Sequence, residues 1–140
     1  MSAGRGILHG EANASAVEPV HFYQIWLYPE REGIEPSYEQ KAFPDDGERN
    51  QWRLVVSPDG RGGSLRIHQD ASIHLATLDE GQSLSQPIEE GRAAWLQVLR
   101  GSVSLGGQTL KAGDGAAIAD ESSINLRASG PSELMLFDLA

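Results

Sequence analysis

Short apolar segments recur about every ten residues from residue 52 to the end of the chain. Each alternates apolar and polar positions or is rich in β-branched residues, and Gly, Pro, Asp and Ser separate one from the next. The segments are Trp52–Ser57, Ser64–His68, Ile73–Leu78, Ala94–Leu99, Ser102–Leu105, Gly115–Ile118, Ile124–Arg127 and Glu133–Leu139. This spacing is typical of an antiparallel sandwich or barrel and predicts an all-β domain with little helix.

The connections between these segments have the residues that turns require. Gly106 and Gly107 stand between two strand-like segments and supply the positive φ angles of a two-residue hairpin. Ser57–Gly60 and Ala112–Gly115 have turn compositions as well. No window has a sustained helical period, and Glu89–Arg92 is predicted to hold at most a turn.

The first 50 residues have a different pattern. His21–Tyr28 has strong β-propensity, with Phe22, Gln24, Trp26 and Tyr28 on one face and Tyr23, Ile25 and Leu27 on the other. Because both faces are apolar, we expect a central strand. Pro29–Pro44 follows it and contains three prolines and many charges. A connection of this length normally wraps a surface or serves a function.

Composition narrows the chemistry. The 140 residues fit a single domain and include no cysteine, so any metal must be held by nitrogen and oxygen. The formal net charge of -9 argues against nucleic acid and anionic membranes as partners, because both require clustered Lys and Arg. The start of the chain has no secretory signal pattern, and no apolar run is long enough to span a bilayer. We expect a cytoplasmic protein.

One histidine and one carboxylate are spaced as metal ligands on a strand would be. Side chains two residues apart on an extended segment project the same way, so His9 and Glu11 can reach one ion. A mononuclear site normally takes three or four such donors. The pair therefore predicts at most part of a site.

The other candidate residues favour structural roles. His68 and His74 stand six residues apart across a predicted turn and can face each other on paired strands, but caps or solvated positions are more common for such residues. His21 begins an apolar segment and is expected to be a hydrogen-bonded core or edge histidine. Trp26, Trp52 and Trp95 are expected in the core rather than around a small-molecule pocket. Asp45-Asp46 and Glu89-Glu90 are expected in solvated loops.

Several stretches resemble the pirin-like bicupins, the family that includes bacterial quercetin 2,3-dioxygenases. The family's Met-Thr-Ala-Gly-x-Gly-Ile-x-His-Ser-Glu stretch is matched by Met1–Glu11, and its Leu-His-Phe-x-Gln-Ile-Trp strand by Val20–Trp26. Its Pro-Glu-Arg-Glu-Gly segment is matched by Pro29–Phe43, and its C-terminal cupin by Gly63–Asp70 and Trp95–Gly101. The resemblance covers essentially the whole chain and implies a cupin-type jelly roll.

The resemblance also implies a metal site. In the family's N-terminal cupin, three histidines and a glutamate bind a divalent metal such as iron, copper or nickel, and the last two ligands match His9 and Glu11. The intact enzymes chelate a flavonol on this metal, a glutamate accepts the 3-hydroxyl proton, and dioxygen opens the heterocycle with release of carbon monoxide. Glu11 is the matching catalytic residue, provided that the full site is assembled.

The remaining two ligands have no match in this chain. They come from a His-x-His segment that would precede Met1, which itself aligns with an internal methionine of the family. We therefore interpret residues 1–45 as the tail of the N-terminal cupin with the inter-cupin strand and connection, and residues 46–140 as a degenerate C-terminal cupin. In that cupin, Pro87, Glu89 and Ala94 occupy the positions of metal ligands, and 111–125 contains no histidine.

Two functions follow from this interpretation. The chain is a non-catalytic packing or dimerisation module that binds no metal stably, or it is part of a quercetinase-type dioxygenase whose site the missing segment completes. Since loss of half a bicupin exposes an apolar face, we expect a homodimer or a partner cupin half, with exchange of the N-terminal segment in a dimer.

Overall fold

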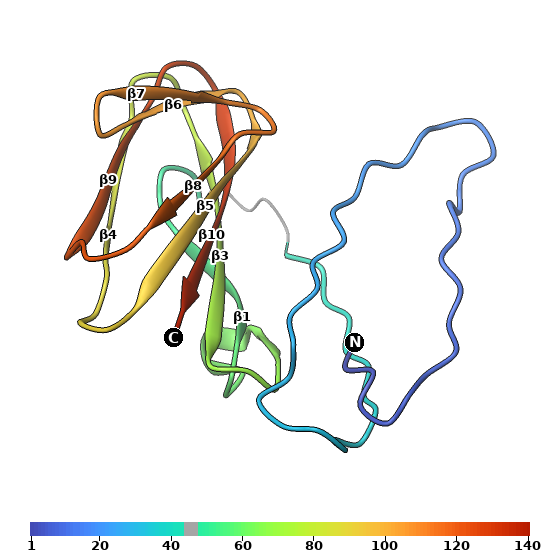
Figure 1. Ribbon diagram of the computed structural model, residues 1–140. Helices are drawn as coiled ribbons and strands as arrows, with labels where there is room; N and C mark the ends of the chain where they lie inside the picture. Colours follow the sequence, from blue (N-terminus) through green and yellow to red (C-terminus); the bar gives the residue numbers. More distant parts are fainter. Residues whose placement is uncertain (44–47) are drawn as a thin grey trace.

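The computed structural model describes residues 1–43 and 48–140, and these form a β-body and an extended N-terminal arm (Figure 1). We use "the arm" for residues 1–43 and "the body" for residues 48–140. The predicted boundary between residues 45 and 46 and the acidic pair Asp45-Asp46 lie outside the described residues. Within the described ranges no helix is long and apolar enough to cross a membrane.

The body consists of ten strands and one 3-10 turn. They are β1 (Arg53–Ser57), η1 (Arg61–Gly63), β2 (Leu65–Arg66), β3 (Ala71–Leu78), β4 (Ser83–Pro87), β5 (Ala93–Arg100), β6 (Ser102–Leu105), β7 (Gln108–Lys111), β8 (Gly115–Ile118), β9 (Ser123–Ala128) and β10 (Ser132–Leu139). All eight strand segments predicted from the alternation coincide with strands.

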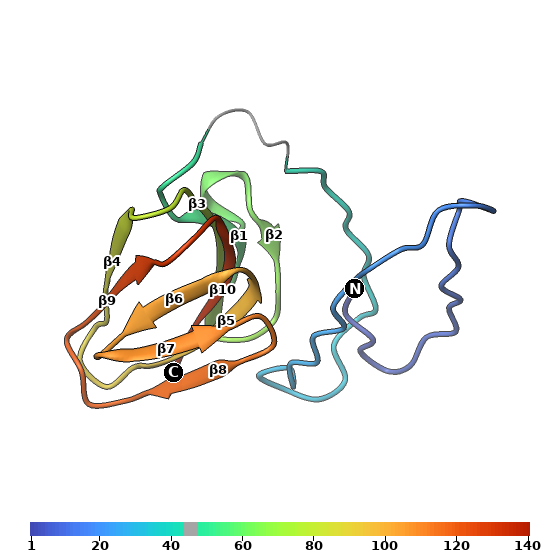
Figure 2. The same cartoon turned by 90° about the horizontal axis from the view of Figure 1, so that it is seen from above.

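The strands form two sheets that face each other (Figure 2). The larger sheet has the order β2-β1-β3-β10-β5-β8, and the smaller has the order β4-β9-β6-β7. Every pairing is antiparallel except that of β1 with the two-residue β2. The predicted all-β sandwich is confirmed.

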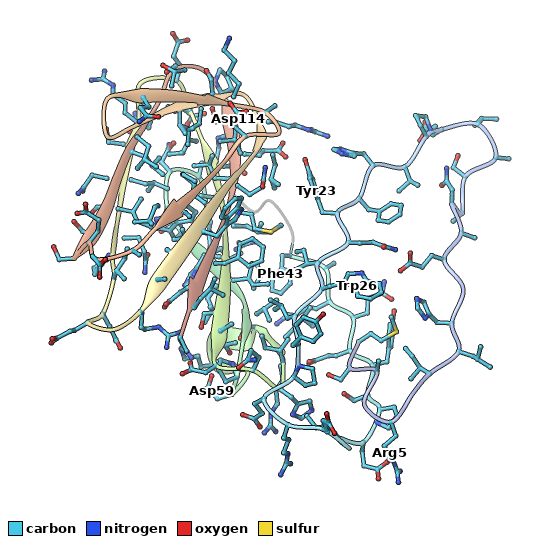
Figure 3. All side chains as sticks on the ribbon, in the orientation of Figure 1. Arg5, Tyr23, Trp26, Phe43, Asp59 and Asp114 are labelled. Atoms are coloured by element: carbon cyan, nitrogen blue, oxygen red, sulfur yellow. The ribbon has the colours of Figure 1, made fainter. Side chains whose placement is uncertain are left out.

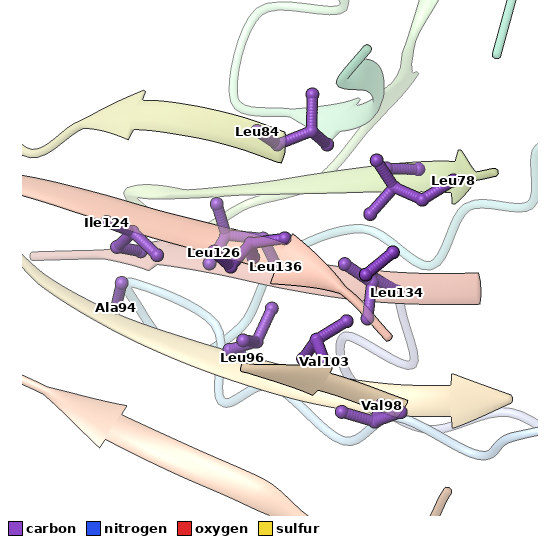
Figure 4. Close-up of a cluster of buried hydrophobic side chains, with 12 residues drawn as sticks. Leu78, Leu84, Ala94, Leu96, Val98, Val103, Ile124, Leu126, Leu134 and Leu136 are labelled. Atoms are coloured by element: carbon purple, nitrogen blue, oxygen red, sulfur yellow. The ribbon is translucent and has the colours of Figure 1, made fainter. Parts of the chain in front are cut away.

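The core lies between the sheets because alternate residues of the central strands point inward (Figure 4). On the larger sheet, Leu136 of β10 stands opposite Leu96 of β5, and all of Leu136 and Leu96 is buried. Val103, Ile124 and Leu126 of the smaller sheet complete the cluster. The intervening residues of β5 and β10 point to the outer face of the larger sheet, where the arm lies.

Turn residues behave as their composition requires. Gly106 and Gly107 have φ angles of 56° and 80° and connect β6 to β7 as a hairpin. The 89–92 stretch is a turn closed by the bond from the Arg92 N–H to the Glu89 carbonyl. Two strands of the body, β4 and β7, were not predicted. In β4, Ser83, Ser85 and Gln86 reduce the apolar signal to Leu84, and in β7 the only apolar residue is Leu110.

The predicted central strand over His21–Tyr28 is wrong: the segment has no strand assignment, and every residue in it is exposed. Its side chains still alternate as the sequence suggested. Trp26 and Tyr28 are 89% and 92% exposed, whereas Leu27 between them is 36% exposed. A β-strand requires the backbone of a neighbour, and no strand of the body pairs with this segment. The β-propensity of the segment is therefore not sufficient to make it a strand.

The N-terminal turn is anchored to the middle of the arm. Ser2 and Ser37 exchange both backbone hydrogen bonds, and Arg5 forms a salt bridge with Glu35. Gly4 has a φ of 51°, and a Cβ atom at this position would stand 2.0 Å from the Ile34 carbonyl oxygen. Only glycine therefore fits where these two segments meet.

Beyond this anchor the arm forms two extended limbs joined by a polar turn. The Asn13 side chain accepts a bond from the Ser15 N–H and donates one to the Glu18 carbonyl oxygen, which reverses the chain direction. The first limb carries His9 and Glu11, and the returning limb carries Val20–Tyr28. This arrangement brings the predicted ligand pair beside the aromatic segment.

Candidate functional site

His9 and Glu11 lie together at the surface of the arm. The His9 Nε2 atom is 3.8 Å from the Glu11 Oε1 atom, and both side chains are about half exposed. The first limb is extended at this point, so residues two apart project the same way, as the sequence predicted. Two donors on one divalent ion would stand about 3–3.5 Å apart, which a small side-chain shift from this geometry would reach.

The other Glu11 oxygen is held from the returning limb. Gln24 Nε2 donates a hydrogen bond of 2.7 Å to Glu11 Oε2. The carboxylate therefore meets an amide donor on one oxygen and the His9 imidazole on the other. Sequence reasoning placed Gln24 on the same strand face as Phe22 and Trp26 but gave it no role, because its partner is 13 residues away.

The pair has no third ligand in the described residues. Across residues 1–43 and 48–140 no group of three or more His, Asp and Glu side chains is arranged to hold a metal ion. Imidazole nitrogen and carboxylate oxygen are donors that nickel, iron and copper accept. The two donors are therefore of the types that such a metal accepts, but they are only half of the four ligands that a complete site would have.

The remaining histidines lie apart from this pair. His21 is exposed and packs on Tyr23 with the ring centroids 5.0 Å apart, so the expectation of a core or edge histidine is wrong. His68 lies in the bend after β2, where its carbonyl oxygen accepts a bond from the Glu30 N–H. Since β2 pairs with β1 and not with β3, His68 and His74 do not lie on paired strands.

His74 points into the sandwich at one end. In the register it stands between Leu54 of β1 and Leu136 of β10, both inward-facing positions. Its Nδ1 atom is buried and has no hydrogen-bond partner among the described residues. Burial lowers the pKa of His74 below its ordinary value; the Asp138 carboxylate opposes this shift and the Arg61 guanidinium adds to it.

Charged side chains close the same end of the body. Arg92 Nε donates to Asp138 Oδ1 at 2.5 Å, and Arg92 also bonds Asp70 at 3.0 Å. These bonds, with that of Asp138 dominant, raise the pKa of Arg92 above its ordinary value. Asp59 near Arg61 has a lowered pKa, chiefly because its carboxylate accepts a bond from the Arg61 backbone N–H. The charged side chains of this cluster pair with one another, so we assign the cluster a structural role in closing this end of the sandwich.

An apolar groove separates the arm from the body. Its volume is about 540 Å³, and it runs between the returning limb and the outer face of the larger sheet. Its lining comprises Tyr23, Gln24, Ile25, Trp26, Leu27, Trp95, Gln97, Leu99, Gly113, Met135, Phe137 and Leu139. In Figure 3 Tyr23 extends toward the body, where its hydroxyl reaches the Leu99 carbonyl oxygen at 3.4 Å.

The three tryptophans have different positions. Trp52 packs against the core as expected, with its Nε1–H buried and unpaired within the described structure. Trp95 lines the groove on the outer face, and Trp26 is almost fully exposed, so neither belongs to the core.

The positions that align with metal ligands in the C-terminal cupin carry no cluster of donors. Pro87 is an exposed residue at the end of β4, Glu89 is exposed in the turn before β5, and Ala94 is buried in β5. Glu90 beside Glu89 is exposed as well, as predicted for a solvated loop.

Comparisons with known proteins place this architecture. Residues 54–139 match the quercetinase C-terminal cupin domain. The chain is 46% identical to a quercetin 2,3-dioxygenase of Escherichia coli K12 over 140 residues, which are 99% of this chain and 59% of that protein. It is 38% identical to a putative quercetin 2,3-dioxygenase of Pasteurella multocida over 141 residues, again 99% of this chain and 59% of the relative. The chain thus spans about three fifths of these relatives.

Solved structures agree with the sequence comparison. The crystal structure of YhhW from Escherichia coli superposes with a TM-score of 0.75 at 39% identity, covering 80% of this chain and 47% of that one. A structure of the bacterial pirin YhhW in complex with nickel(II) gives a TM-score of 0.74 at 40% identity, covering 79% and 47%. The chain therefore belongs to the pirin-like, quercetinase-type cupin family, and its body is the family's C-terminal cupin.

Proposed function

We propose that this chain is a non-catalytic packing module, which binds a second cupin unit through the returning limb of its arm. The observation that carries the proposal is the exposed aromatic row of Phe22, Trp26 and Tyr28, which alternate along the returning limb and are 58%, 89% and 92% exposed. Apolar side chains of this size are seldom left in water unless they contact another surface.

The size of the row is adequate for a dimer. An aromatic side chain buries about 150–250 Å² when fully covered, so three of them in each of two copies bury roughly 900–1,500 Å² in total. A stable interface requires about 1,000 Å². The occupant that we propose for the isolated chain is a second copy, with the two returning limbs pairing as antiparallel strands across a twofold axis.

Charge affects this assembly in a predictable direction. Each copy carries a formal net charge of -9, so like-charge repulsion opposes the dimer. Salt screens that repulsion, whereas apolar burial persists. The dimer should therefore become tighter as sodium chloride is raised from 20 to 300 mM.

Light scattering coupled to size exclusion tests the proposal. We expect a dimer at high micromolar concentration, and a monomer for the double variant Phe22→Ser with Trp26→Ser. Leu8→Ser is the control, because Leu8 is a fully exposed apolar residue on the first limb and lies outside the proposed contact. A monomeric wild-type chain, or a control that dissociates as readily as the double variant, would contradict the proposal.

A second candidate function rests on the His9–Glu11 contact. The chain would contribute half of a metal-dependent dioxygenase site, which an upstream His-x-His segment completes. A divalent metal bound there would act as a Lewis acid toward a chelating flavonol oxygen. His9 would hold the ion through Nε2, and Glu11 would bind it through Oε1 or accept the substrate's hydroxyl proton.

Metal content and quercetin turnover distinguish the two functions. For the second, we expect the chain alone to bind nickel weakly and to leave quercetin intact, whereas a version extended upstream binds one ion per chain and cleaves quercetin. His9→Ala should abolish both properties in the extended version, and His21→Ala should not. Failure of the extended version to bind metal would eliminate the half-site, and tight metal binding with turnover by the short chain would contradict the first function.

A further inference from the structure

We infer that Gln24 is the positioning residue of the His9–Glu11 half-site and that it couples metal binding to the docking face of the arm. The inference rests on the second candidate function, since it assigns a role to a residue that holds one of the two proposed ligands. Gln24 would not itself touch the metal.

The geometry of the carboxylate carries the inference. Glu11 Oε2 accepts the Gln24 amide bond at 2.7 Å, so Oε1 is left on the side of His9, 3.8 Å from Nε2. A free glutamate side chain at a half-exposed position would sample several rotamers. The amide bond removes part of that freedom and presents one oxygen beside the imidazole. Partners of this kind orient metal ligands in other proteins, and their loss typically costs about 10–100-fold in metal affinity.

The bond also connects the two limbs of the arm. Glu11 comes from the first limb and Gln24 from the returning limb, and the turn at Asn13–Glu18 lies between them. Loss of the Gln24 amide would leave the ligand pair on a limb whose residues 8–14 are all exposed. Gln24 therefore holds the ligand-bearing limb against a segment that itself contacts the body through Tyr23.

Gln24 links the proposed docking surface to the proposed metal ligands. By alternation Gln24 shares a face with Phe22 and Trp26, the face that we propose as the docking surface. A cupin unit placed on that face would exclude water from the Gln24–Glu11 bond, which strengthens it in the lower dielectric. A partner that covers the aromatic row would thus also fix the carboxylate.

The first experiment tests the bond without metal. In the ¹⁵N-labelled 140-residue chain, the side-chain amide signals of Gln24 should shift on Glu11→Ala, whereas those of Gln108, an exposed glutamine of β7, should not. Unchanged Gln24 amide signals would show that the hydrogen bond does not form and would overturn the inference.

The second experiment measures nickel affinity by calorimetry or NMR titration. Gln24→Leu should weaken nickel binding by about tenfold, the lower end of the range for such partners because the site is exposed. Gln108→Leu is the matched control and should leave affinity within a factor of two. An unaltered affinity in Gln24→Leu would overturn the positioning role.

Nickel affinities of the His9 and Glu11 variants distinguish failure of the half-site from failure of the role assigned to Gln24. If His9→Ala lowers nickel affinity while Gln24→Leu does not, the half-site stands and the role of Gln24 falls. If His9→Ala and Glu11→Ala have no effect, the half-site itself falls, and the role assigned to Gln24 falls with it. Circular dichroism of each variant verifies that the body remains folded.

Discussion

The indole of Trp95 lies directly against Gly115 on the outer face of the larger sheet. A Cβ atom at Gly115 would stand only 2.3 Å from Trp95 Cζ2. The indole Nε1–H points to Gln97 Oε1 at 3.3 Å, and the Gln97 amide donates to the Asp114 carbonyl oxygen at 3.0 Å. The orientation of one wall of the groove therefore depends on the absence of a side chain on β8.

Gly115→Ala should destabilise the body by about 1–3 kcal/mol, because the methyl group overlaps the indole and one of the two must move. Urea denaturation monitored by circular dichroism gives this value. Gly130→Ala is the matched control, since a Cβ atom at Gly130 contacts nothing within 4 Å and its φ is not positive. Equal stabilities for the two variants would show that Trp95 does not rest on Gly115.

The ion pair of Arg92 with Asp138 should contribute more than an exposed pair. The Arg92 side chain is only 18% exposed, and it bonds Asp138 and Asp70. Arg92→Leu leaves the partly buried Asp138 carboxylate without its strongest donor, which should cost about 1–3 kcal/mol. In Arg100→Leu the lost partner is Glu133 in an exposed pair, and the loss should be below about 1 kcal/mol. Thermal melts of the two variants compare these effects, and the reverse order of stability would contradict the assignment.

Limited trypsin digestion should cut the arm before the body. Arg31 lies in an exposed segment without strand pairing, whereas Arg100 and Arg127 lie in strands β5 and β9, whose backbones are paired. Cleavage requires local opening, which costs little in the arm. Mass spectrometry should detect an early fragment that begins after Arg31 or Lys41 and ends at Ala140. Arg31→Gln should remove the first of these cuts and leave the second, and early cleavage at Arg127 would contradict the division into arm and body.

The body could be predicted from the sequence because its signals are local. In β5 and β10, alternate residues such as Leu96, Val98, Leu134 and Leu136 face the core, so a period of two is visible without knowledge of any neighbour. β4 was not predicted because its exposed positions are two serines and a proline, and a single buried leucine shows no periodicity.

The arm could be predicted only in part, because its structure depends on contacts between distant residues. The spacing of His9 and Glu11 was sufficient to place them together. The strand expected at His21–Tyr28 failed because propensity describes one chain, whereas pairing requires two. The Gln24–Glu11 and Tyr23–Leu99 contacts span 13 and 76 residues, and no spacing rule links such positions.

The buried imidazole of His74 predicts a pH dependence of stability. Burial is the largest cause of its lowered pKa, the nearby Arg61 adds to the shift, and Asp138 opposes it. The unfolded chain therefore binds a proton at His74 at a higher pH than the folded chain does. Stability from this group is complete above the unfolded pKa of about 6.5 and is lost as pH falls through the lower folded value.

Urea midpoints measured between pH 8 and pH 5 test this expectation. The free energy of unfolding should fall below pH 6.5, with a slope under about 1.4 kcal/mol per pH unit, the limit for one group, because water reaches part of the ring. His74→Leu places an apolar side chain between Leu54 and Leu136 and should flatten the curve over this range. His68→Leu is the control, since His68 lies outside the sandwich, and it should retain the wild-type slope. If His74→Leu also keeps the wild-type slope, the acid sensitivity arises instead from carboxylates that lose their partners on protonation. Asp79, which accepts hydrogen bonds from Arg49 and Asn50, is such a carboxylate. Because these bonds lower the pKa of Asp79, the stability that it contributes is lost at a more acidic pH.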